Sequence, residues 1–162
     1  MSKDFLWAPW RMDYISNPDK EQNIFIKKAQ SKDDRENLVL HRAKKNFIVM
    51  NLYPYNNGHI MIVPYEKHDD MTNLDIETLH EIMALSKESM KILKLILKSD
   101  GFNFGLNMGK AAGAGIDDHL HFHIVPRWSG DSNFMPVIGH TKIIMQSLFD
   151  TYDMLKPKFD IL

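Results

Sequence analysis

Three histidines within five residues are the first feature of this sequence that could carry chemistry. They are His119, His121 and His123 of the stretch HLHFHIVPRW, in a chain that has only 8 histidines. Neutral imidazole binds metal ions, attacks electrophiles and transfers protons near neutral pH. The spacing therefore indicates a metal site, a catalytic site or a row of surface histidines.

The residues between the histidines predict the local structure. Leu120, Phe122 and Ile124 alternate with the imidazoles, and a period of two is typical of a strand with two different faces. We therefore expect a strand over residues 119–125, with the histidines facing outward on one side and the apolar residues facing a core. Pro126 is expected to end the strand, because it has no N–H for the ladder.

Two alternatives to catalysis are open at this point. Histidines at i and i+2 of a strand can share one zinc ion, but a third ligand is then needed. The chain has no cysteine, and the nearest carboxylates are Asp117 and Asp118 in the preceding loop. The histidines could also be ordinary solvated side chains on an edge strand.

The catalytic alternative rests on the glycine-rich segment GKAAGAG, residues 109–115, just before the histidines. Backbone N–H groups without bulky side chains can surround phosphate oxygens. A histidine whose pKa is near its usual value of about 6.5 is a competent nucleophile toward phosphorus. A neighbouring histidine can fix its tautomer or protonate the leaving group.

Short strands and three helices must position this stretch. Periodicity and turn residues predict a helix over 19–30, strands over 37–43, 46–53, 59–65 and 102–108, a helix over 75–98 and a last helix over 140–155. Hairpin-length links between the strands favour an α+β fold, an antiparallel sheet of about five strands with helices packed on it. We expect a single domain over residues 1–162, with an aromatic N-terminal arm over 1–18.

Composition limits the classes of partner. The net charge of −1 gives no reason to expect nucleic-acid binding, and no segment approaches the roughly 18 apolar residues of a membrane span. The N-terminus lacks the uninterrupted apolar run of a signal peptide. The absence of cysteine excludes disulfides and fits an intracellular protein, so the cytoplasm is the expected location.

Several motifs together resemble one known family. HLHFHIVPRW is similar to the His-φ-His-φ-His-φ-φ signature of the histidine triad (HIT) nucleotide-binding enzymes, where φ is an apolar residue. GHIMIVPYEKH, residues 58–68, resembles the Gly-His strand of that family, and NLYPYNNGH precedes it in the expected way. The resemblance spans about residues 20–128. LWAPWRMDYI and SGDSNFMPV resemble a bacterial and archaeal branch related to diadenosine tetraphosphate phosphorylases.

The resemblance implies roles for individual residues. His121 matches the nucleophile that forms a covalent nucleotidyl-histidine, His119 would orient it, and His123 would contact the phosphates or assist the leaving group. Asn51 falls where a side chain binds the ribose hydroxyls, and His59 has a structural role, with its ring bonded to backbone. The remaining substrate-binding positions are Ile24, Phe25 and Val49 around the base, and Asn107, Gly113 and Gly115 at the phosphate loop. Without the resemblance, the three apolar residues would be ordinary core.

Two departures from the family pattern matter. Many bacterial relatives have Cys-x-x-Cys where this chain has Asn23–Ile26, so the associated structural zinc is not expected. Phosphoramidase members have a serine where Ile116 stands, which argues against phosphoramidase activity. His123 is retained, although some transferase branches have glutamine there.

The implied protein is an enzyme that cleaves the α-phosphate of an adenine nucleotide or dinucleoside polyphosphate, with diadenosine tetraphosphate phosphorolysis as the best hypothesis. The resemblance also implies a homodimer and no protein-bound cofactor, with Mg²⁺ arriving only with the nucleotide. Lys110 and Arg127 are candidate groups for holding a phosphate acceptor. The alternatives are a HIT-type hydrolase or phosphoramidase, and a nucleotide-binding module with little turnover. The sequence leaves base preference and polyphosphate length open.

Overall fold

The computed structural model describes residues 23–131 and 146–162. The predicted aromatic arm lies outside these ranges, as do residues 19–22 of the predicted first helix and 140–145 of the predicted last helix. The elements in chain order are α2 (Ile24–Gln30), β1 (Val39–Arg42), β2 (Asn46–Met50), β3 (Ile60–Pro64), the 3-10 turn η3 (Met71–Asn73), α3 (Ile76–Leu97), β4 (Gly101–Leu106), the 3-10 turn η4 (Lys110–Ala112), β5 (Phe122–Arg127) and α5 (Leu148–Phe159).

The five strands form one antiparallel sheet in the order β1-β2-β3-β5-β4. Every residue of β2 and β3 is buried, as expected for central strands covered on both faces. The hairpin between β1 and β2 turns at Lys44 and Lys45, as predicted, and the carboxylate of Glu81 accepts both backbone N–H groups. The predicted α+β architecture with a five-stranded antiparallel sheet is confirmed.

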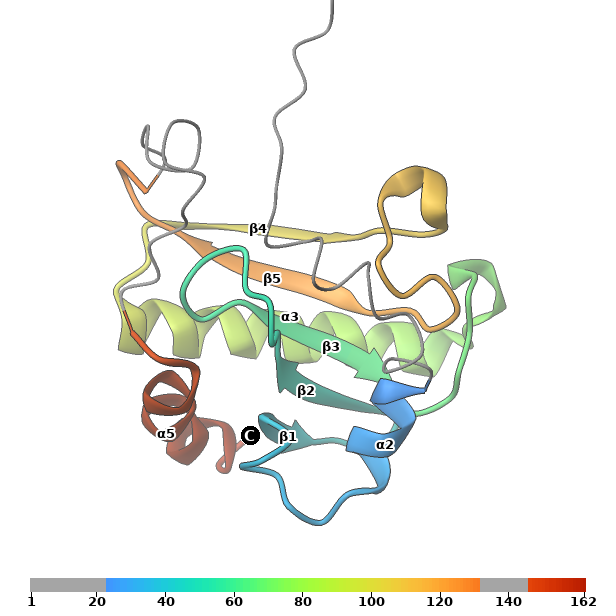
Figure 1. Cartoon of the computed structure of the whole chain (residues 1–162), viewed down its shortest axis with the longest axis horizontal. Helices are drawn as coiled ribbons and strands as arrows, with labels where there is room; N and C mark the ends of the chain where they lie inside the picture. The colour runs from blue at the N-terminus through green and yellow to red at the C-terminus, as the bar shows by residue number, and fades with distance from the viewer. Residues whose placement is uncertain (1–22, 132–145) are drawn as a thin grey trace, which may run out of the picture.

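Helices cover the sheet from different sides. Figure 1 shows α3 crossing behind the sheet, α2 in front of it and α5 beside β1. The apolar stripe of α3 includes Ile82 and Leu93, both almost fully buried. The helix predicted over 75–98 is confirmed to within one residue at each end, and the residues before it form the separate turn η3. Helix α3 starts one residue after Asp75, whose carboxylate accepts the N–H of Thr78 at 2.8 Å.

The last helix differs from its predicted range. It begins at Leu148, after Ser147, whose hydroxyl accepts the N–H of Asp150 at 3.1 Å. It continues to Phe159, past the predicted end at residue 155, although Pro157 lies in its last turn. Phe159 is completely buried, so packing of this ring holds the last turn against the core.

The histidine strand also differs from its predicted range. Strand β5 begins at Phe122, so His119 and His121 lie in the segment before it, and only His123 is in the strand. Pro126 does not end the strand, because it pairs with Phe102 of β4. Proline is tolerated there since pairing with β3 reaches only Ile124, and beyond it β5 has a partner on one side.

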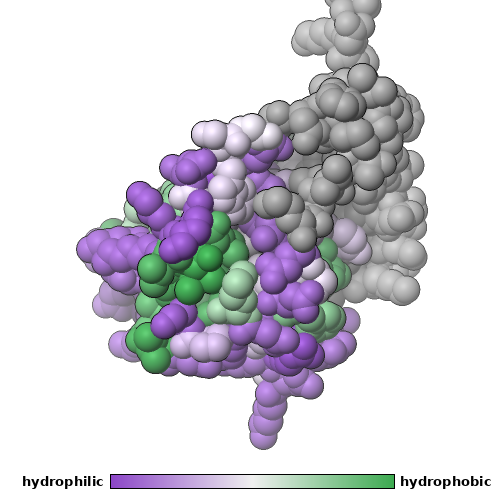
Figure 2. Space-filling view, turned by 90° about the vertical axis from the view of Figure 1, so that its left-hand side faces the viewer, coloured by the Kyte–Doolittle hydropathy of each residue, from purple (hydrophilic) through white to green (hydrophobic). Residues whose placement is uncertain are grey.

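Apolar side chains reach the surface mainly as scattered groups. The end of the molecule that includes α5 shows an apolar patch bordered by hydrophilic side chains (Figure 2). Exposed apolar residues at this end include Leu95 on α3 and Phe149 on α5, and the guanidinium of Arg35 lies 4.9 Å from the centre of the Phe149 ring. In the described ranges, no helix has the length and apolar character that crossing a membrane requires.

Candidate active site

A pocket of about 830 Å³, including its open mouth, lies on the face of the sheet that carries His123 and Met61. These two residues are register partners on β5 and β3, so their side chains share that face. The lining residues are Ile24, Phe25, Lys28, Met50, Asn51, Leu52, Tyr53, Tyr55, Met61, Asn107, Gly115, Ile116, His121 and His123.

The three clustered histidines are buried rather than outward-facing. His119, His121 and His123 are 3%, 6% and 8% exposed, so the expectation of a solvated row of imidazoles is wrong. The reason is that α2 packs over this part of the sheet, with Phe25 in contact with His119 and His121 at ring-centre distances of 5.4 and 5.2 Å. Leu120, Phe122 and Ile124 are buried as predicted.

His121 has the geometry of a neutral nucleophile. Its Nδ1–H donates to the backbone carbonyl of His119 at 2.9 Å, which leaves the lone pair on Nε2. Burial lowers the pKa of His121, while the bond to the carbonyl opposes that shift. The ring therefore stays uncharged near neutral pH and presents a basic nitrogen on a pocket-lining side chain.

His119 holds His121 through its backbone rather than its ring. The Nε2–H of His119 donates to the carbonyl of Pro64 at 2.9 Å, away from His121. Burial lowers the pKa of His119, and its Nδ1 has no hydrogen-bond partner among the described residues. His119 itself does not line the pocket. If it orients the nucleophile, it does so with its carbonyl oxygen.

A hydrogen-bond relay fixes the third histidine. The backbone N–H of Tyr55 donates to His59 Nδ1 at 2.9 Å, so the proton of His59 is on Nε2. That Nε2–H lies 2.9 Å from His123 Nδ1 and donates to it. Neutral His123 then carries its own proton on Nε2, which can donate to a ligand oxygen. The ring of His59 is bonded to backbone, as expected, and also sets the tautomer of His123.

Asn51 lies in the pocket just after β2. Its Oδ1 accepts the backbone N–H of Tyr53 at 2.9 Å, which orients the amide and leaves a second lone pair on the oxygen. This is suitable for accepting a hydroxyl proton. The ribose-binding role of Asn51 remains a prediction with consistent geometry.

The apolar residues assigned to the base have different positions. Ile24 and Phe25 line the pocket, because α2 lies over the sheet there. Val49 does not line it, although it shares the face of Met61, and its side chain is completely buried. The ordinary-core interpretation therefore describes Val49 better than direct base contact.

The glycine-rich loop is partly closed on itself. Asn107 and Gly115 line the pocket, whereas Gly113 caps η4 with a left-handed φ of 83° and does not line it. The N–H groups of Ala112 and Ala114 donate to Gly109, and that of Gly113 donates to Lys110. Three N–H groups of the loop are therefore used within it, and the phosphate-binding role of the loop remains a prediction.

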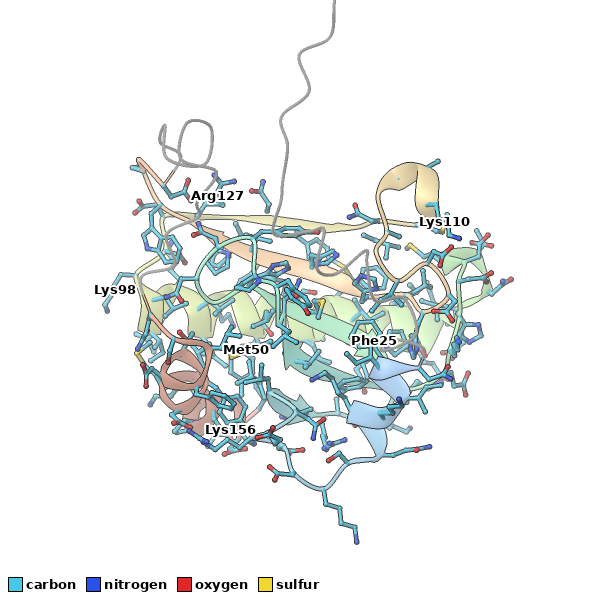
Figure 3. The ribbon with its side chains drawn as sticks, in the orientation of Figure 1. Phe25, Met50, Lys98, Lys110, Arg127 and Lys156 are labelled. Carbon is cyan, nitrogen blue, oxygen red and sulfur yellow. The ribbon has the colours of Figure 1, made fainter. Side chains whose placement is uncertain are left out.

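The two candidate cations for an acceptor lie apart. Figure 3 shows Lys110 and Arg127 at opposite ends of the β4–β5 pair. Arg127 is about 20 Å along the strand from His121, by strand rise, and forms a bidentate pair with Asp131. Arg127 is therefore not placed to hold an acceptor at His121. Lys110 lies within the glycine-rich loop, with its Nζ 3.5 Å from Asp117 Oδ2.

Sequence reasoning missed half of the lining. Lys28, Met50, Leu52, Tyr53, Tyr55 and Met61 were not assigned to the site, and Ile116 was considered only as a departure. Met61 could have been found from the register of β3 with the histidine strand. Lys28 could have been found from helical spacing, because it follows Ile24 by four residues and Phe25 by three.

The zinc associated with some relatives has no suitable ligands in this chain at the corresponding place. Residues Asn23–Ile26 offer no thiol or imidazole. In the described residues, no group of three or more histidine or acidic side chains is placed to bind a metal ion. The expectation of no protein-bound metal stays a prediction.

The chain belongs to the HIT domain family, whose sequence model matches residues 32–130. The resemblance read from the histidine motif is thereby confirmed. A more particular similarity is to AP-4-A phosphorylase of Mycobacterium tuberculosis, with 41% identity over 159 residues, covering 93% of this chain and 81% of that protein.

Solved structures share the fold at lower identity. A Zn-bound histidine triad family protein from Mycobacterium smegmatis superposes with a TM-score of 0.67 at 20% identity, covering 85% of this chain and 91% of the other. A Plasmodium falciparum diadenosine triphosphate hydrolase gives 0.62 at 23% identity, covering 80% and 77%. These likenesses support the HIT fold and nothing finer.

Proposed function

We propose that this protein cleaves dinucleoside polyphosphates at the α-phosphorus through a nucleotidyl-His121 intermediate, and that its substrate is diadenosine tetraphosphate. The observation that carries the proposal is the bond from His121 Nδ1–H to the His119 carbonyl, which leaves Nε2 as a neutral nucleophile on a side chain that lines the pocket. The 41% identity to AP-4-A phosphorylase supports this substrate class.

The first step forms a bond between Nε2 of His121 and the α-phosphorus of one adenosine. The bond from that phosphorus to the bridging oxygen breaks, and ATP leaves with the electron pair. His123, with its proton on Nε2 through the relay from His59, donates a hydrogen bond where negative charge develops. AMP is then attached to His121.

In the second step an oxygen of inorganic phosphate attacks the same phosphorus. The N–P bond breaks, His121 Nε2 regains its lone pair, and ADP is released. The likeness to a phosphorylase favours phosphate over water as the acceptor. Ile116 lines the pocket with an apolar side chain, so that position supplies no hydroxyl of the phosphoramidase kind.

We further propose that the active form is a homodimer that extends the sheet, in the cytoplasm. Strand β4 supports the dimer: within the described ranges it pairs only with β5, and Asn103, Phe104 and Gly105 on it are exposed. An open edge of this kind can pair with a second copy. Sedimentation analysis tests the dimer, and cell fractionation tests the location.

The function is tested with diadenosine tetraphosphate, millimolar phosphate and the His121→Ala variant. We expect ADP and ATP from the wild type, and an acid-labile AMP adduct when phosphate is omitted. His121→Ala should lose turnover and adduct by several orders of magnitude while still binding AMP, because only the chemical step is removed.

His80→Ala is the matched control, since His80 is exposed on α3 and away from the lining. Near-normal turnover in His121→Ala would refute the assignment of His121 as the nucleophile. AMP plus ATP formed at a rate independent of phosphate would identify a hydrolase instead. Binding of AMP without adduct or turnover in the wild type would identify a binding module.

A further inference from the structure

Lys28 is the one lysine, arginine or carboxylate among the described lining residues of the pocket. The histidines of the lining include His121, which burial keeps neutral. The neighbours of Lys28 on the lining, Ile24 and Phe25, are apolar. A half-buried ammonium group in such a wall is a strong and directional donor.

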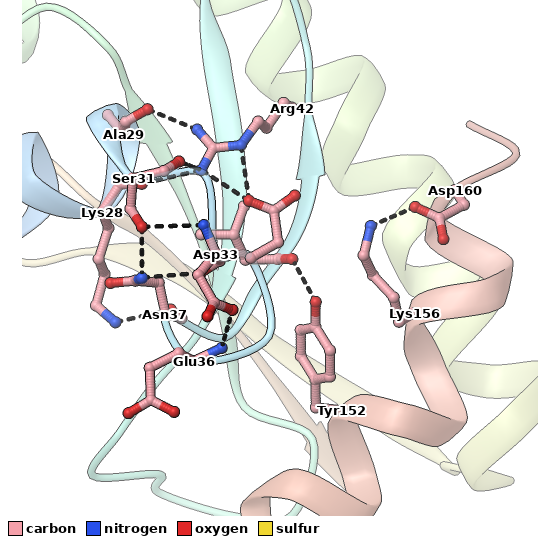
Figure 4. A network of polar contacts seen from close by, with 12 residues as sticks. Lys28, Ala29, Ser31, Asp33, Glu36, Asn37, Arg42, Tyr152, Lys156 and Asp160 are labelled. Carbon is pink, nitrogen blue, oxygen red and sulfur yellow. Dashed lines mark hydrogen bonds and ion pairs between the residues drawn. The ribbon is translucent and has the colours of Figure 1, made fainter.

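Contacts on both sides hold Lys28 in place (Figure 4). Its Nζ donates to the backbone carbonyl of Asn37 at 2.7 Å. Its own backbone carbonyl accepts from Arg42 at 3.0 Å, and Arg42 also donates to the carbonyls of Ala29 and Ser31 at 2.7 and 2.8 Å. Both the backbone and the tip of Lys28 are therefore fixed before a ligand arrives.

The position of Lys28 along α2 separates it from the reacting atoms. Phe25, which is assigned to the base, contacts the rings of His119 and His121 near the start of α2. Lys28 is one helical turn further, about 4.5 Å along the axis, and its tip points to Asn37, just before β1. Lys28 thus lies on the wall formed by Ile24 and Phe25, the residues assigned to the base, and further along α2 than the ring contact with His121.

We propose that Lys28 selects the base, by donating a hydrogen bond from its ammonium group to a ring nitrogen acceptor of the purine held at the α2 end of the pocket. The proposal rests on the proposed function. One of the three N–H groups of Lys28 is used by Asn37, which leaves two for the base. A base that presents a donor at the same place would leave two buried donors facing each other, which is costly.

Burial lowers the pKa of Lys28, and the charge of Glu36 opposes the shift. The dehydrated ammonium therefore gains more from an acceptor than a solvated lysine would. Selection by a hydrogen bond in an otherwise apolar wall also discriminates better than shape alone.

The test measures binding of AMP and of its 1-deaza, 3-deaza and 7-deaza analogues by calorimetry. Each analogue replaces one ring nitrogen by C–H and so removes one acceptor. We expect one of the three to bind the wild type about tenfold more weakly than AMP. In Lys28→Met, AMP itself should weaken by about the same factor, and the same analogue should lose nothing more.

Lys27→Met is the matched control, because Lys27 is an exposed lysine on the same helix outside the lining. It should retain the wild-type pattern. Lys28→Gln keeps an N–H donor, and recovery of part of the analogue selectivity would show that donation rather than helix packing is responsible. Thermal melts of all variants check that they fold.

Three outcomes overturn the inference. An unchanged analogue pattern in Lys28→Met would mean that Lys28 does not contact the base. A raised KM for phosphate with normal AMP binding would make Lys28 an acceptor-binding residue. If the wild type binds AMP and turns over normally, either result leaves the proposed function intact. Failure of the wild type to bind any adenine nucleotide would overturn both proposals.

Discussion

Arg42 is the residue through which the sheet holds one wall of the pocket, and its loss should affect stability and substrate binding together. From β1 its guanidinium donates to the carbonyls of Lys28, Ala29 and Ser31, at the C-terminal end of α2. Its Nε also donates to Asp34 at 2.9 Å. These carbonyls have no partner within the helix and carry the negative end of its dipole, so a cation is favoured there.

The size of the effect follows from these contacts. The Arg42–Asp34 pair is about three-quarters buried, with side-chain exposures of 28% and 29%. Hydrogen bonds to a charged group contribute about 1.5–3 kcal/mol each, but water replaces part of them at a half-buried helix end, so we expect Arg42→Met to lower the free energy of unfolding by about 3 kcal/mol. For a chain of this length that corresponds to a drop in Tm of about 6–12 °C.

The assay combines urea denaturation with the KM for diadenosine tetraphosphate. Because Ile24, Phe25 and Lys28 belong to α2, a loosened helix should raise KM with little change in kcat. Arg42→Lys should recover part of the stability, since an ammonium keeps the charge but cannot span three carbonyls as a planar fork does.

Arg35→Met is the control, because Arg35 also makes a bidentate pair, with Asp153, but the side chains are 57% and 51% exposed. Exposed pairs contribute little, so its denaturation midpoint should barely move. Equal denaturation midpoints for Arg42→Met and the wild type, or equal losses of stability in the two methionine variants, would refute the inference that Arg42 holds α2 against the sheet.

Three further predictions follow from the site. Asn51→Ala should weaken AMP binding by about 1–3 kcal/mol, because the ribose hydroxyls lose an oriented acceptor. Calorimetry with 2′,3′-dideoxy-AMP, which lacks those hydroxyls, should show a smaller loss, and an equal loss would mean that Asn51 does not contact the ribose. Burial lowers the pKa of His121, so kcat/KM should stay level as the pH falls through about 6.5 and decline only below it. Stability against urea should fall below about pH 6.5, because the unfolded chain there binds the proton that the folded ring excludes. A loss of activity centred above pH 6.5 would contradict this prediction. Finally, elemental analysis should find no stoichiometric zinc and EDTA should leave Tm unchanged, because Asn23–Ile26 has no ligands, whereas one tightly bound zinc per chain would revive the metal hypothesis.

The sheet was predictable from the sequence because its signals are local. Alternating apolar residues, turn residues at Lys44 and Lys45, and one long amphipathic period each determine an element without reference to the rest of the chain. The errors fall where tertiary contacts decide. Buried Phe159 carries α5 beyond Pro157, and β4 pairs with Pro126 after β3 has ended.

The site was predictable only in part, because only some of its signals are local in the sequence. The histidine spacing identified the reacting segment, but the burial of the imidazoles depends on α2 packing over the sheet from nearly 100 residues away in the sequence. The role of Val49 could not be predicted from its residue type, because an apolar side chain fits a base pocket and a core equally well. Only its complete burial in the folded chain distinguishes the two.

The bonds of the three histidines explain why spacing alone does not define their roles. Each ring has one nitrogen committed to a different partner: His119 to the carbonyl of Pro64, His121 to the carbonyl of His119, and His123 to His59. The first two partners accept a hydrogen bond and the third donates one, so His121 keeps a lone pair on Nε2 while neutral His123 keeps a proton on Nε2. Neighbouring imidazoles of identical chemistry thus become a nucleophile and a hydrogen-bond donor, and the difference comes from His59 and a backbone carbonyl rather than from the triad itself.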